Sequence, residues 1–133
     1  PERPDAWREL AWFLATCPDA ALRDGQQAID FATKARDLWA NSEPEWLRGT
    51  KVAPEMAAKF KDSRKKGLSD DAATLAAAYA EVGNFEEAIQ SQTKAIELSR
   101  SDQERNEHRR RLALYQRRER YRDADSDDGR DNK

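Results

Sequence analysis

The chain has 133 residues, of which 38% are charged and 38% hydrophobic, and its 24 Lys and Arg against 26 Asp and Glu leave a net charge of −2. That length suits one domain, and the near balance of charge excludes a global electrostatic field that would attract a partner. One Cys and one His exclude a disulfide framework and most metal sites built on cysteine or histidine.

Uncharged runs in the chain are short. The longest, 10–18 and 72–80, have nine residues each, whereas a helix that spans a membrane takes about 20. No segment combines a basic start, an apolar run and a cleavage site, so no signal peptide is visible. We therefore expect a cytoplasmic protein without membrane insertion.

The composition favours helices. There are 22 alanines but only 10 Val, Ile and Thr in total, and β-branched side chains lose rotamer freedom in helices whereas Ala loses none. The glycines and prolines fall between or at the edges of helical patterns and leave no glycine-rich loop for phosphate. The sequence therefore predicts an all-α fold of five or six helices.

The first two helices have clear start and stop signals. The first is predicted over about 4–17 and is ended by Pro18. The second begins after Asp24, whose spacing to Gln27 is that of a capping box, and ends near Trp39.

An insertion, 41–69, follows the first helix pair. Within it, 54–66 is predicted as a short helix closed by Gly67. The insertion is apolar enough to pack, through Trp46, Leu47, Val52, Met56 and Phe60. Either it lies over the neighbouring helices or it forms an arm that binds a partner.

Three further helices are predicted. One follows Ser69 and ends at Gly83, the next opens at Asn84, and the last opens at Ser101 and covers 102–122 as a capping helix. Asn84 and Ser101 each have a glutamate three residues later, the spacing of a capping box.

Two helix pairs share one pattern of small and apolar residues. Trp7, Leu10, Ala11 and Leu14 match Ala72, Leu75, Ala76 and Tyr79 in spacing, and Ala28, Ile29, Ala35 and Leu38 match Ala88, Ile89, Ala95 and Leu98. The pattern resembles the tetratricopeptide repeat (TPR), a 34-residue helix–turn–helix unit. The resemblance covers about 5–40 and 69–100, and the second copy, with Gly83 and Phe85 at the signature spacing, is the better match.

The two copies depart from a regular array. Ala28 and Ala88 are 60 residues apart, 26 more than one repeat, and the loop of the first hairpin is five residues longer than that of the second. The string LAWFLATCPDAALRDGQQA is similar to a degenerate variant of the repeat in large multidomain bacterial proteins, where it scaffolds rather than catalyses.

The resemblance implies a solenoid-like scaffold that binds a protein or peptide in a groove lined by the first helix of each pair. Carried over to this sequence, the groove residues are Arg8, Trp12, Ala73, Ala77 and Ala80. Because alanine at 73 and 77 cannot supply the polar side chains of the family's carboxylate clamp, an apolar helix or an extended segment is the expected ligand.

Nothing in the sequence predicts catalysis or a cofactor. His108 lies among arginines that oppose its protonation, without a second histidine or cysteine at ligand spacing. Cys17 comes at the end of an apolar helix, which indicates a small buried hydrophobe.

Charge is strongly segregated near the C-terminus. Residues 105–122 hold eight Arg against two Glu, a net charge of +6, whereas 123–133 carry −3. The candidates for electrostatic contact are Arg110, Arg111, Arg117 and Arg118. This stretch is a solvated cap, a contact for a protein or acidic peptide, or a nucleic-acid site.

The sequence predicts a protein-interaction or scaffolding module. Two alternatives stay open: an oligomerisation or intramolecular docking unit of a larger multidomain protein, and a nucleic-acid-associated adaptor that acts through the arginine-rich helix.

Overall fold

The computed structural model of the chain describes residues 3–41 and 52–122. Its elements are α1 (Pro4–Thr16), the 3₁₀ turn η1 (Ala20–Leu22), α2 (Gly25–Ala40), α3 (Pro54–Glu81), α4 (Phe85–Glu97) and α5 (Asp102–Gln116). These residues contain no strand, and the prediction of an all-α fold is confirmed. Two parts of the chain that the sequence analysis singled out lie outside the described residues: Trp46 and Leu47 of the insertion, and the acidic stretch 123–133.

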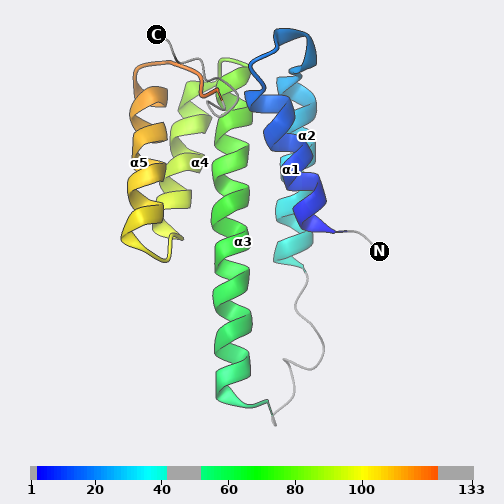
Figure 1. The fold of residues 1–133 in the computed structure, drawn as a ribbon, viewed down its shortest axis with the longest axis vertical. Helices are drawn as coiled ribbons and strands as arrows, with labels where there is room; N and C mark the ends of the chain where they lie inside the picture. The colour runs from blue at the N-terminus through cyan, green and yellow to red at the C-terminus, as the bar shows by residue number, and fades with distance from the viewer. Residues whose placement is uncertain (1–2, 42–51, 123–133) are drawn as a thin grey trace.

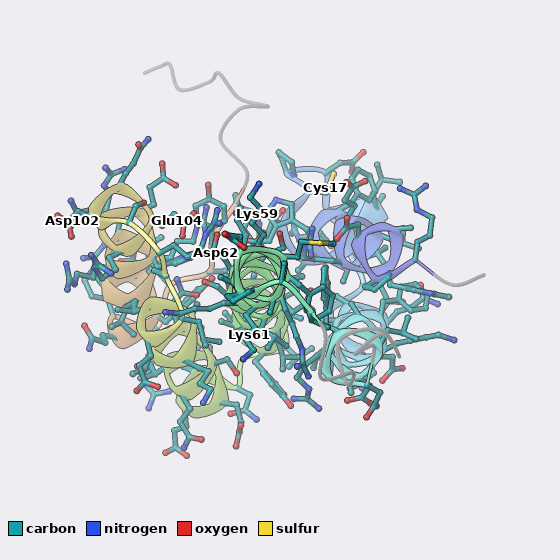
Figure 2. The ribbon with its side chains drawn as sticks, turned by 90° about the horizontal axis from the view of Figure 1, so that it is seen from below. Cys17, Lys59, Lys61, Asp62, Asp102 and Glu104 are labelled. Atoms are coloured by element: carbon teal, nitrogen blue, oxygen red, sulfur yellow. The ribbon has the colours of Figure 1, made fainter. Side chains whose placement is uncertain are left out.

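Helix α3 lies in the middle of the molecule. It packs against α1 and α2 on one side and against α4 on the other, and α4 packs against α5 (Figure 1). The view along α3 shows α1 and α5 on one side of it and α2 and α4 on the opposite side (Figure 2). The first helices of the two predicted pairs, together with α5, therefore share one face.

Three predicted N-caps are present with the expected hydrogen bonds. The Asp24 carboxylate accepts from the Gln27 N–H at 3.0 Å, the Asn84 side chain accepts from the Glu87 N–H at 3.2 Å, and the Ser101 hydroxyl accepts from the Glu104 N–H at 3.1 Å. Each bond satisfies a backbone donor that the first helical turn leaves unpaired. The local sequence therefore sets where α2, α4 and α5 begin.

The two hairpins close in the same way despite their different loops. The Asp24 N–H donates to the Leu14 carbonyl at 2.9 Å, and the Asn84 N–H donates to the Tyr79 carbonyl at 2.9 Å. In the second hairpin Gly83, at φ +85°, makes a short turn that an L side chain rarely permits. In the first hairpin the longer loop is taken up by η1, so the helices still meet at matched residues.

Alanines form the contact between the helices. Ala15 and Ala28 of the first pair pack against Ala77 and Ala78 of α3, and Ala11 and Ala32 pack against Leu75. The six alanines named in these two clusters, Ala11, Ala15, Ala28, Ala32, Ala77 and Ala78, are at most 2% exposed. Small side chains let helix axes approach closely, so a chain with few large apolar residues still buries a continuous core.

The structure corrects the expected break at Gly67. Helix α3 runs without interruption from Pro54 to Glu81, so the predicted inserted helix is the first half of the helix that opens the second pair. Ser69 does not cap a helix, because its hydroxyl donates to the Ala95 carbonyl of α4 at 2.9 Å. Arg100, in the turn before α5, forms an ion pair with Asp62 in this first half of α3.

Gly67 is required for packing rather than for helix termination. A Cβ atom there would lie 2.5 Å from Cε2 and 2.7 Å from Cζ2 of the Trp39 ring, which comes from the end of α2. Contacts this short do not occur, so the ring and an added methyl group could not both keep their places.

We expect Gly67→Ala to destabilise the chain by about 1–3 kcal/mol, measured by urea unfolding, because it overpacks the Trp39 contact. At an unobstructed helical site the same change would stabilise by about 1 kcal/mol. Ser63→Ala, at an exposed position of α3, is the control and should change stability by less than about 0.5 kcal/mol. If Gly67→Ala lowers the free energy of unfolding equally in the native chain and in the Trp39→Ala variant, this explanation is contradicted.

Candidate functional site

A groove lies on the shared face of α1, α3 and α5. Its central cavity measures about 290 Å³ and is lined by Arg8, Glu9, Trp12, Asp70, Ala73, Thr74, His108 and Arg111. Helices α1 and α5 form its walls and α3 forms its floor. The groove is therefore open to solvent between elements that are far apart in sequence.

The structure brings together three of the five predicted groove residues. Arg8, Trp12 and Ala73 line the cavity. Ala77 is 2% exposed in the contact with the first helix pair, and Ala80 is fully buried in a cluster with Tyr115. Matching by repeat position thus identifies the helix that forms the floor, but the last two alanines lie beneath the surface.

An arginine packs against two contacting aromatic rings at one end of the groove. The Arg111 guanidinium lies 5.0 Å from the centre of the Trp12 ring and 4.9 Å from that of the Tyr121 ring. The two rings are themselves 5.5 Å apart and tilted by 44°. Cation–π attraction and ring contact thus connect α1, α5 and the segment that follows α5.

That segment is not helical, which corrects the predicted extent of the capping helix. Helix α5 ends at Gln116 rather than at 122. Arg118 has φ +61°, and the Glu119 N–H donates back to the Leu114 carbonyl at 2.8 Å. This left-handed turn reverses the chain. We call residues 117–122 the strap.

The strap crosses the end of α3 and is held at Glu81. The Arg120 Nε donates to the Glu81 carbonyl at 3.1 Å, and the Arg122 guanidinium lies 2.9 Å from the Glu81 carboxylate. Arg23, in the loop before α2, pairs with the same carboxylate at 3.2 Å. One carboxylate therefore joins the first hairpin, α3 and the strap.

Side chains alone attach the end of the strap to the described residues. The last backbone-to-backbone hydrogen bond within the described ranges is the one donated by Glu119. Beyond it the contacts are those of Arg120, Tyr121 and Arg122. Tyr121 also packs against the buried cluster of Ala76, Ala80, Phe85, Ala88 and Tyr115, so the end of the strap is held by ion pairs, ring contacts and apolar packing of half-buried side chains, without backbone ladder bonds.

The four arginines predicted to make electrostatic contacts lie in different surroundings. Arg111 lines the groove, Arg117 pairs with Glu119 at 3.3 Å, and Arg118 lies over the Phe85 ring at 6.0 Å. Arg110 borders a second cavity of about 450 Å³, which also includes Arg111 and Tyr121. Only Arg110 and Arg111 of the four therefore face the cavities.

His108, in the groove wall, has a structural role. Its Nε2 atom lies 3.5 Å from the Ser69 hydroxyl, and its backbone carbonyl accepts from Gln92 at 2.9 Å. Burial, and then the charge of Arg111, lower the pKa of the imidazole. The ring is therefore neutral near pH 7 and helps to fasten α5 to α3 and α4.

Asp71 was not among the predicted site residues. Its side chain has no exposed surface, one oxygen lies 3.4 Å from the Arg8 guanidinium, and the other has no hydrogen-bond partner. Burial raises the pKa of this carboxyl to about 7, against the lowering effect of Arg8. The sequence does indicate that this carboxyl is buried, because Asp71 precedes the buried Leu75 by four residues and so lies on the same helical face.

Other chemical centres are lacking in the parts of the chain that the structure describes. There, no three His, Cys, Asp or Glu side chains are grouped so as to hold a metal ion. Cys17 is a buried free thiol. No helix within 3–41 and 52–122 has the length and apolar character to cross a bilayer.

Comparison of the chain with protein-family models, with curated proteins and with solved structures finds no match.

We expect the buried carboxyl of Asp71 to make stability depend on pH. Its pKa is about 7 in the folded chain and near 4 in the unfolded chain, so the folded state binds the proton more tightly between these values. The native chain therefore loses stability as pH rises from about 4 to 7. An amide does not titrate, so the stability of Asp71→Asn relative to the native chain should rise by about 2 kcal/mol between pH 5 and pH 8.

Urea unfolding at several pH values measures this difference. Because Arg8 lowers the pKa of Asp71, Arg8→Gln should extend the loss of stability above about pH 7. If the free energy of unfolding of Asp71→Asn relative to the native chain does not change from about pH 5 to 8, the carboxyl of Asp71 does not resist ionisation.

Proposed function

We propose that the chain is a protein-interaction module with TPR-like helical pairs, which binds an extended segment of a partner protein in the groove and has no catalytic activity of its own. The observation that carries this proposal is the partly exposed Trp12 ring, set in a groove wall beside Arg111 and above a floor of small side chains.

The order of helix contacts supports the repeat interpretation. Helix α1 packs on α2 and α3, α2 packs on α3, and α3 packs on α4, which carries α5. This is the arrangement expected when helix pairs stack side by side and a final helix covers the last pair. The matched hydrogen bonds that close the two hairpins support it independently.

The lining of the groove supports a peptide as the ligand. Arg8 and Arg111 provide donors, Glu9 and Asp70 provide acceptors, and Trp12 offers an aromatic surface. An extended segment presents backbone donors and acceptors together with alternating side chains, so it can use both charges and the ring. A smooth apolar helix would make no polar contact with these groups and would still have to desolvate them.

The contacts of the arginine-rich stretch favour protein over nucleic acid. Arg117, Arg120 and Arg122 pair with carboxylates of the same chain. Arginines bound in this way are less available to neutralise phosphates, which supply most of the affinity for nucleic acid.

Trp12→Ala tests the proposal, with Phe13→Ala as a matched control. Phe13 is the next residue of α1 and is 47% exposed, but it does not line the groove. We expect Trp12→Ala to weaken binding of captured partner proteins about tenfold or more, because aromatic residues at the centre of an interface carry much of its energy. Quantitative affinity capture with mass spectrometry measures the effect, and circular dichroism checks that helicity is kept. Capture that is equal for both folded variants would refute the groove assignment.

A further inference from the structure

The strap lies where the groove and the second cavity meet. Tyr121 contacts Trp12, which lines the groove, and Tyr121 itself lines the second cavity. Arg111 lines both cavities and contacts both rings. The strap therefore covers surface that the proposed function assigns to a partner.

We propose that the strap is an intramolecular occupant of one end of the groove and that a segment of a partner protein displaces it. In that partner segment an aromatic residue is followed directly by a basic residue. This inference rests on the proposed function, because it names the chemistry of the ligand for the same groove.

The position of Tyr121 defines the aromatic part of the ligand. Its ring lies against Trp12 at 5.5 Å and against the Arg111 guanidinium at 4.9 Å. These two side chains belong to α1 and α5, whose backbone positions do not depend on the strap. A ring and a guanidinium arranged in this way attract another aromatic ring.

The position of Arg122 defines the basic part. Its guanidinium lies 2.9 Å from the Glu81 carboxylate, at the end of α3. The Glu81 side chain is only 17% exposed and keeps Arg23 as a neighbour, 3.2 Å away, when the strap is absent. A cation in the position after the aromatic residue restores the ion pair that Arg122 makes with this carboxylate.

The attachment of the strap suits an occupant that can be displaced. Beyond Glu119 no described backbone group of the strap pairs with another described backbone group, and Arg117, Arg118 and Arg120 are exposed. The segment is nevertheless tethered directly to α5, so its effective concentration at the groove is about millimolar. A partner segment must bind the groove tightly enough to displace the tethered strap, and a variant that releases the strap should therefore bind partner segments more tightly.

The probe is the strap itself as a blocked peptide with the sequence RRERYR, added to the ¹⁵N-labelled full chain up to about 2 mM. The readout is the indole N–H resonance of Trp12, assigned with Trp12→Phe. In the full chain carrying Tyr121→Ala, we expect the peptide to move this resonance back toward its native position. We also expect the apparent Kd to be at least about fivefold lower than for the native chain.

Matched peptides and a second variant sharpen the test. Peptides with Ala in place of the tyrosine, or with Glu in place of the final arginine, should fail to shift the resonance. Arg122→Gln, which removes the ion pair with Glu81 and the guanidinium bond to the Tyr121 carbonyl but keeps the Tyr121 ring, should give an intermediate Kd, and it replaces Tyr121→Ala if circular dichroism shows that variant to be unfolded. Equal binding of RRERYR to the native and released chains, or equal binding of the alanine peptide, overturns the inference.

A library of displayed peptides selected on the released chain separates this inference from the proposed function. Trp12-dependent peptides that carry an aromatic–basic pair and compete with RRERYR support both. Trp12-dependent peptides without that pair overturn the inference and leave the proposed function standing. A library that yields no Trp12-dependent peptide overturns both.

Discussion

Close approach of helices through alanine is the constraint on which the rest of the structure depends. Helix α3 meets α1 and α2 at Ala77 and Ala78 and meets α4 through Ala73 and Ala95. Each alanine buries little area, so stability comes from the continuity of the contact rather than from large side chains. Of these alanines Ala73 also lies in the floor of the groove, so the larger binding groups, Arg8, Trp12 and Arg111, come from its walls.

The ends of the helices are predictable from sequence because their chemistry is local. Asp24, Asn84 and Ser101 each bond to a backbone N–H three residues away, and no other part of the fold is needed for that. The role of Gly67, by contrast, depends on a residue distant in sequence. It has the local appearance of a helix end, but the Trp39 ring occupies the space where its side chain would be. A contact between residues 28 positions apart leaves no local pattern.

The candidate site is predictable in part for the same reason. Repeat matching places Arg8, Trp12 and Ala73 on one face because helical spacing fixes the direction of each side chain. The strap could not be foreseen, since its turn depends on Arg118 in a conformation that glycine or asparagine favours, and its anchor Glu81 is distant in sequence. Asp71 was overlooked because an aspartate near a predicted helix start is ordinarily explained by the helix dipole.

The continuity of α3 has a mechanical consequence. Its 28 residues span about 42 Å at 1.5 Å per residue, and its first half extends well beyond α4 and α5 (Figure 1). The floor of the groove and this projecting half belong to one rigid rod. One continuous helix therefore connects Pro54 with Ala73, past the contacts of Gly67 with Trp39 and of Asp62 with Arg100. A sequence with a true helix break at Gly67 would have separated the two ends mechanically.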